Sequence, residues 1–126
     1  ELERARDDIR AALATVEPPA ASGGTTLVGV AGTVTTLAAI ELGLDVYDPA
    51  RVHGARLGRA SVYALAEKLA KLSLTERQAL AGLEPKRADV IVVGAAIVRE
   101  VLEWSGSSEL VVSDRGVRWG LAERLA

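Results

Sequence analysis

Apolar residues recur along the chain with two different spacings, which predict an alternation of helices and strands. Helical spacing predicts helices over residues 1–16, 34–42, 58–72 and 117–125, and a short one from the Ser73 capping box to Gly82. Short β-branched runs predict buried strands at 25–30 and 109–113, and a more polar run predicts a short edge strand at 51–57. Residues 20–24, after Pro18 and Pro19, are expected to form a flexible connection. This order is typical of an α/β fold with a parallel pair of strands at its centre.

The stretch from 85 to 104 is apolar on every side, so its period does not distinguish a buried helix from a buried strand. Its length is too great for one strand and favours a single, largely buried helix. Gly94 lies within it, at a cost of about 1 kcal/mol relative to alanine unless a neighbouring element packs closely there.

The chain is organised around residues 25–43, where a strand, a loop of small residues and a helix follow one another. Thr33 is predicted to be the N-cap of that helix. The small side chains of Gly29, Ala31 and Gly32 let another molecule approach the backbone. Unpaired N–H groups at a helix start attract phosphate, so we expect a phosphate site here. An ordinary strand-to-helix turn with nothing bound is the alternative.

The second predicted strand also ends in a turn, at residues 113–116, and this turn opens a helix. The carboxyl ends of neighbouring parallel strands face the same crevice, so both turns are expected to line one cleft. Arg118 and Arg115 either reach that cleft or pair with Asp114 or Glu123.

Composition narrows the partners. The 126 residues suit a single domain, and 15 basic against 17 acidic residues give a net charge of −2. This balance offers no general attraction to nucleic acid or to an anionic membrane. The absence of cysteine excludes disulfides and thiolate metal sites and fits a cytoplasmic protein, and His53, as the single histidine, excludes a histidine cluster. Methionine is absent even at position 1, so we expect the chain to be a fragment of a longer protein.

Four segments carry a resemblance: GVAGTVTTLA at 29–38, VHG at 52–54, RADVI at 87–91 and SDRGVRWGL at 113–121. In this order they resemble the Ppx/GppA phosphatase family, which comprises exopolyphosphatases and guanosine pentaphosphate phosphatases on the actin-like ATPase fold. The resemblance implies a partial ribonuclease-H-like lobe, the C-terminal part of the second lobe, with a short central parallel sheet flanked by helices. The catalytic glutamate and phosphate loops of the family's N-terminal half have no match in this sequence.

The resemblance implies part of a phosphohydrolase that releases terminal phosphate from inorganic polyphosphate or from guanosine pentaphosphate. Its expected partners are one of those substrates, the N-terminal lobe of the same protein and a second copy in a homodimer, with no nucleic acid and no membrane. Mg²⁺ is the implied cofactor, with no metal ligand and no catalytic residue in this chain. The carboxylates of Asp89 and Asp114 have ordinary capping or ion-pair explanations.

The expected phosphate-binding residues are Ala31, Gly32, Thr33, Arg87 and Arg118, and the expected cleft residues are Gly29, His53 and Arg115. Two other functions stay open from the sequence. One is a non-catalytic lobe that binds phosphate or nucleotide or forms a dimer. The other is an ATP-binding lobe like those of sugar and acetate kinases.

Overall fold

The computed structural model describes residues 1–19 and 26–126, so the predicted connection at 20–24 and Thr25 of the predicted strand lie outside the described residues. Its helices are α1 (Leu2–Leu13), α2 (Gly32–Leu42), α3 (Pro49–Val52), α4 (Arg59–Lys71), α5 (Leu74–Gln78), α6 (Ile91–Ser105) and α7 (Val117–Leu125), with a 3-10 turn, η1, at Pro85–Arg87. Its strands are β1 (Val28–Val30), β2 (Arg56–Gly58) and β3 (Glu109–Ser113).

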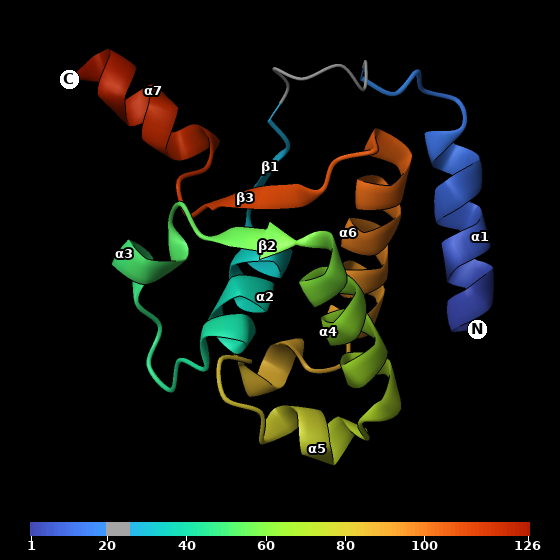
Figure 1. Cartoon of the computed structure of the whole chain (residues 1–126). Coiled ribbons are helices and arrows are strands. Elements are labelled where there is room, and N and C mark those ends of the chain that lie inside the picture. The colour runs from blue at the N-terminus through green and yellow to red at the C-terminus, as the bar shows by residue number, and fades with distance from the viewer. Residues whose placement is uncertain (20–25) are drawn as a thin grey trace.

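β3 is the central strand of a three-stranded sheet with the order β1-β3-β2. β1 runs parallel to β3, with Val28 opposite Val111, and this confirms the predicted parallel pair. β2 runs antiparallel along the other edge, with Leu57 opposite Leu110. Helices α2, α4 and α6 pack together on one side of the sheet (Figure 1). The fold is therefore the predicted α/β arrangement of a small sheet flanked by helices.

The described helices cover only one face of the sheet. The side chains of β3 alternate between buried and half-buried positions. In β1, Gly29 faces the helices, and a β-carbon there would lie 2.7 Å from Val34 Cγ1 of α2. Val28 and Val30 face the other way and are 52% and 51% exposed. The prediction of a strand buried on both faces is therefore wrong, because β1 is an edge strand with helices on one side only.

α2 forms the centre of the core. Its residues Leu37 and Ala38 are 0% exposed. The helix begins at Gly32 with Ala31 as its N-cap, so the prediction of Thr33 as N-cap is wrong. It ends as predicted at Gly43, which adopts a left-handed conformation with φ of 65°.

The polar run at 51–57 was predicted as one edge strand but divides into a helical turn and a strand. Asp48 caps α3 by accepting a hydrogen bond from the Ala50 N–H at 3.1 Å, and Pro49 opens the helix, so the chain turns before β2 begins. The predicted capping box of Ser73 and Glu76 is confirmed at the start of α5, which ends before the predicted Gly82.

The single helix predicted for 85–104 is also wrong, because η1 and α6 are separate elements. Arg77 accounts for the interruption. Its guanidinium donates hydrogen bonds to the carbonyl of Ala88 at 2.6 Å and to the carbonyls of Leu69 and Leu72 at the end of α4. These bonds hold the segment after η1 against α4 and α5, and α6 begins only beyond it.

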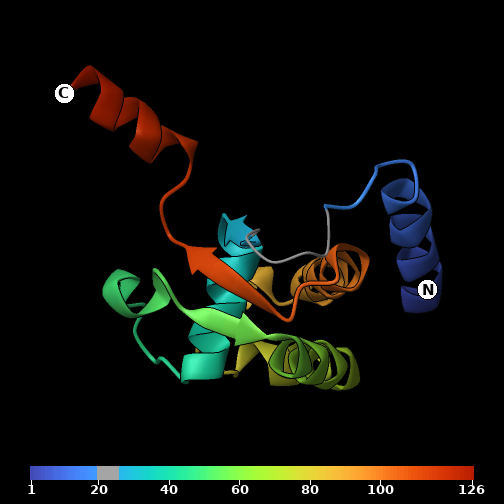
Figure 2. The ribbon, with the colours of Figure 1, turned by 45° about the horizontal axis from the view of Figure 1, so that its top comes forward.

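α1 packs along the outer side of α6 (Figures 1 and 2), and ion pairs join the two helices. The carboxylate of Glu100, with a side chain only 4% exposed, accepts hydrogen bonds from Arg6 Nε at 2.9 Å and Arg10 Nε at 3.0 Å. Burial raises the pKa of Glu100, but the hydrogen bonds from the two arginines outweigh it and leave the pKa below its ordinary value. The predicted amphipathic helix thus depends on charge as well as on apolar packing.

α7 extends away from the sheet, and each of its residues is exposed (Figures 1 and 2). Val117, Leu121 and Leu125 share one side of this helix and are 87%, 56% and 79% exposed. Among the residues that the structure describes, no helix has both the length and the apolar character needed to cross a membrane.

Candidate functional site

The site begins with an unusual backbone conformation between β1 and α2. Ala31 has φ of 75° and ψ of −171°, which non-glycine residues rarely adopt. The N–H groups of the first turn of α2 are left without helical acceptors, and Ala31 has no side-chain acceptor to cap them. The hydroxyl of Thr35 donates hydrogen bonds to the carbonyls of Ala31 and Gly32, each at 3.1 Å, and these bonds hold the turn in place.

Arg87 packs directly against this turn. A β-carbon at Gly32 would lie 1.9 Å from Nη1 of Arg87, so only glycine leaves room for the guanidinium in this position. Nε of Arg87 lies 3.6 Å from a carboxylate oxygen of Glu84, an ion pair that crosses one turn of η1. The positive end of α2 and a guanidinium therefore meet at one glycine.

The loop between β1 and α2 opens into a hollow of about 760 Å³, which we call the loop cavity. Its lining comes from that loop, α2, the turn after β3 and the start of α7: Ala31, Gly32, Thr35, Asp114, Gly116, Val117, Arg118, Trp119 and Ala122. The two strand-to-helix turns thus line one cavity, as the parallel pair predicts. Arg118 lies in this cavity with the small residues of the loop.

Two other residues expected at the site face elsewhere. A β-carbon at Gly94 of α6 would lie 2.8 Å from Cγ2 and 2.9 Å from Oγ1 of Thr33. The Thr33 side chain therefore packs into the space that Gly94 leaves, so a neighbouring helix does pack closely at this glycine. Gly29 lies beneath Val34 and Leu110, in the core.

His53 contacts the turn after β3 and Arg115 is part of that turn, but neither lines the loop cavity. His53 Nδ1 accepts a hydrogen bond from the Asp114 N–H at 3.1 Å, which ties this turn to the end of α3. The Arg115 guanidinium lies over the ring of Trp119, 4.9 Å from its centroid, instead of pairing with Asp114 or Glu123.

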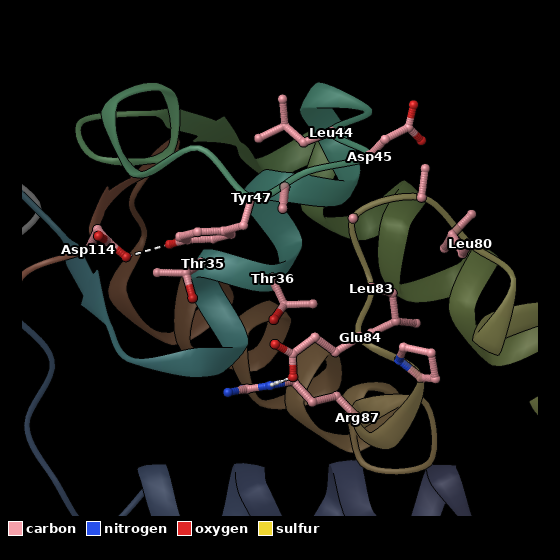
Figure 3. A pocket seen from close by; sticks show the side chains of 14 residues that line it. Thr35, Thr36, Leu44, Asp45, Tyr47, Leu80, Leu83, Glu84, Arg87 and Asp114 are labelled. Carbon is pink, nitrogen blue, oxygen red and sulfur yellow. Dashed lines mark hydrogen bonds and ion pairs between the residues drawn. The ribbon is translucent and has the colours of Figure 1, made fainter.

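A second hollow of about 510 Å³, the tyrosine cavity, adjoins the loop cavity and shares Thr35 and Asp114 with it (Figure 3). Its lining is Thr35, Thr36, Ala39, Leu44, Asp45, Tyr47, Leu80, Ala81, Gly82, Leu83, Glu84, Pro85, Arg87 and Asp114. The Tyr47 hydroxyl donates a hydrogen bond to the Asp114 carboxylate where the two cavities meet. Burial, together with that carboxylate, raises the pKa of Tyr47 to about 12.

Tyr47 and Thr35 are site residues that the sequence analysis missed. Tyr47 lies in the irregular segment between α2 and α3, which has no periodic pattern. The Asp48-Pro49 turn signal next to it was the available clue.

A metal site among these residues is not supported. Among residues 1–19 and 26–126, no three histidine, cysteine, aspartate or glutamate side chains come together to hold a metal ion. The implied Mg²⁺ therefore does not fit a site built from the described residues alone.

Comparisons with known proteins agree with the fold and with the sequence resemblance. Exopolyphosphatase 2 of Mycobacterium tuberculosis is 39% identical over 105 residues, which cover 80% of this chain and 33% of that protein. The bifunctional 3-dehydroquinate synthase/phosphatase of Fusobacterium nucleatum is 34% identical over 88 residues, which cover 70% of this chain and 13% of that protein. A crystal structure of the Aquifex aeolicus Ppx/GppA phosphatase matches with a TM-score of 0.88 at 33% identity, over 95% of this chain and 39% of that one.

The chain thus spans about a third of the length of the Mycobacterium protein, which it covers to 33%. The model of the Ppx/GppA phosphatase family matches residues 1–126, the whole of the sequence. On this match, and on the fold it shares with the Aquifex protein, the chain belongs to the Ppx/GppA phosphatase family.

Proposed function

We propose that this chain is the phosphate-binding part of a phosphohydrolase that removes terminal phosphate from inorganic polyphosphate or from guanosine pentaphosphate. The observation that carries the proposal is the contact of Arg87 with Gly32, at the uncapped N-terminus of α2. Unpaired N–H groups, the positive end of a helix and a guanidinium all favour an anion at that point. The chain's membership of a phosphatase family supports phosphate as that anion.

Each residue has a distinct part in this proposal. The N–H groups of the first turn donate to phosphate oxygens, since the small residues Ala31 and Gly32 let the backbone approach them. Arg87 and Arg118 offset the charge of neighbouring phosphates, and this matters more as the charge of the substrate grows. Thr33 contributes its N–H, because its side chain packs against Gly94.

Binding of tripolyphosphate to the purified chain, measured by calorimetry, tests the phosphate site. Arg87→Ala removes a charge-assisted hydrogen bond at a partly exposed position, so we expect affinity to fall about three- to tenfold, and less for a probe of lower charge such as pyrophosphate. Gly32→Val places a side chain where the guanidinium lies and should weaken binding at least as much. Arg4→Ala, an exposed arginine on α1, is the matched control. Equal affinities across the well-folded variants would refute the site.

The hydrolase assignment needs a separate test, because the described residues offer no convincing catalytic base. We expect no phosphate release from polyphosphate, guanosine pentaphosphate or ATP by this chain alone. Mg²⁺-dependent release that a mutation within the chain abolishes would contradict this. Mg²⁺ and a catalytic carboxylate are proposed to come from outside these residues, from a neighbouring lobe.

A chimera supplies that lobe. This chain would replace the matching 105-residue segment of the Mycobacterium exopolyphosphatase, which is 39% identical to it. We expect the chimera to release phosphate from polyphosphate, and Gly32→Val within it to lower the rate. Tripolyphosphate binding without any release by a folded chimera would instead favour a non-catalytic phosphate-binding lobe. ATP-dependent phosphorylation of a sugar or of acetate would favour the kinase alternative.

A further inference from the structure

The tyrosine cavity adjoins the proposed phosphate site and has Arg87 in its lining, but most of its residues have no part in that site. Its volume of about 510 Å³ lies within the range of about 300–1,000 Å³ that is usual for small-molecule sites. It lies between α2 and the segment from Leu80 to Arg87 (Figure 3), and it shares Thr35 and Asp114 with the loop cavity.

Thr36 is the feature that marks the tyrosine cavity as a binding site. The residue lines the cavity and is only 8% exposed. No described residue forms a hydrogen bond with its hydroxyl. Among the described residues, every side-chain oxygen that is fully enclosed has a hydrogen-bond partner, so the Thr36 oxygen is not fully enclosed and reaches the cavity surface. The hydroxyl therefore offers a donor and an acceptor at the cavity wall, which a ligand or water can pair.

The charge of the lining selects the kind of ligand. Three carboxylates, from Asp45, Glu84 and Asp114, line the cavity with one guanidinium, that of Arg87. Glu84 and Arg87 pair with each other at 3.6 Å, which leaves the charges of the two aspartates. Asp114 accepts a hydrogen bond from the hydroxyl of Tyr47, a neutral donor that does not cancel the charge of the carboxylate. The part of the cavity that carries the two aspartates therefore attracts a cation.

The remaining walls favour a cation that carries carbon. The ring of Tyr47 forms one side of the cavity (Figure 3), and an aromatic face attracts an ammonium group. Ala39, Leu44 and Leu83 give apolar contact for an alkyl chain. A bare divalent ion would need a cluster of oxygen ligands, and the described residues hold no such cluster.

We propose that the tyrosine cavity binds an organic ammonium ion of the aliphatic diamine class, with its charge on Asp45 and Asp114, a hydrogen bond to the Thr36 hydroxyl, and its carbon chain against Leu44 and Leu83. The proposal does not depend on the phosphate site. Where both ligands bind, however, the shared residues Thr35 and Asp114 bring a cation close to an anion, so each strengthens the binding of the other. Thermodynamic linkage requires the two effects to be equal, and we expect about a twofold to fivefold effect at low salt that fades as salt is added.

Calorimetric titration of the chain with putrescine, in a buffer without phosphate, tests the site. Thr36→Val keeps the shape of the side chain and removes the hydroxyl, so we expect affinity to fall about tenfold. Asp45→Asn should weaken binding about threefold, because this carboxylate is exposed. Glu41→Gln removes a charge from the same helix as Thr36 but outside the cavity, and it should leave the affinity unchanged.

Butanediol and guanosine are the control ligands. Butanediol has the same carbon chain without charge and should not bind; equal binding of the diol would refute the role of charge. If guanosine binds and putrescine does not, and Thr36→Val weakens the binding of guanosine, the cavity is a nucleobase site and the proposal is overturned. No saturable putrescine binding, or unchanged affinity in both cavity variants, would also overturn it. Since no phosphate is present, such a failure leaves the tripolyphosphate result untouched.

Discussion

Replacing Ala31 with glycine tests whether the start of α2 is held under strain. With φ of 75° and ψ of −171°, Ala31 occupies a backbone region that is essentially reserved for glycine. Such a residue costs about 1–3 kcal/mol in the folded state. Glycine relieves this strain, but its greater freedom in the unfolded chain costs about 0.4–1 kcal/mol. Ala31→Gly should therefore raise the free energy of unfolding by about 0.5–2 kcal/mol.

Urea unfolding followed by circular dichroism measures this change. For a slope of about 1–3 kcal/mol per molar urea, the midpoint should rise by about 0.5 M. Ala64→Gly is the control, because Ala64 is exposed in the middle of α4 and has helical geometry. There the same substitution should lower stability by about 0.5–1 kcal/mol. The two variants are thus expected to shift in opposite directions.

The same variant reports on the phosphate site. If the surrounding structure holds Ala31 in place to direct the N–H groups of α2, glycine loosens the turn, and affinity for tripolyphosphate should fall a few-fold as stability rises. An Ala31→Gly protein that loses as much stability as Ala64→Gly would show that Ala31 is not strained. A more stable protein with unchanged affinity would separate the strain from ligand binding.

Three further predictions follow from the packing. Gly94→Ala should lower the free energy of unfolding by about 1–3 kcal/mol despite alanine's helix preference, because the new β-carbon would lie 2.8 Å from Thr33 Cγ2. Adding Thr33→Ala should restore much of that loss. An unchanged urea midpoint in Gly94→Ala would contradict this prediction. The pKa of Glu100 is depressed in the folded state, so its contribution is present above the pKa of a free glutamate, about 4.3, and is lost as pH falls through the lower folded value. Unfolding midpoints measured against pH should therefore drop below about pH 4 in the native chain and much less in Glu100→Gln. Val28 and Val30 face outward on an edge strand, so we expect the purified chain to self-associate in sedimentation velocity and Val30→Lys to reduce this; a strictly monomeric native chain would refute it.

Local sequence patterns were sufficient to predict the elements that are marked by the spacing of apolar residues and by small residues. The β-branched run before Gly32 and the apolar residues after it identify β1 and α2, and the β-branched run before Ser113 identifies β3. Their parallel pairing then brings both turns to one cavity without further information. The same reasoning placed β1 between two layers, because a run of valines does not reveal that only one face has helices to cover it.

The contacts that form the candidate site could not be predicted from such local patterns. Arg87 approaches Gly32 across a large sequence separation, and the RADVI segment gave it only by resemblance. The conformation of Ala31 opposes its own propensity, so local rules placed the cap at Thr33 instead. Tyr47 has no periodic context at all.

The pairing of Val28 with Val111 also determines when the site can form during synthesis. β1 leaves the ribosome well before its strand partner β3, which follows only after α6. At about 5–20 residues per second, β1 waits several seconds before it can pair, with its valines and its hydrogen-bonding edge uncovered. The loop cavity is therefore completed late, and premature stops before β3 would release chains with helices formed but with β1 open to association.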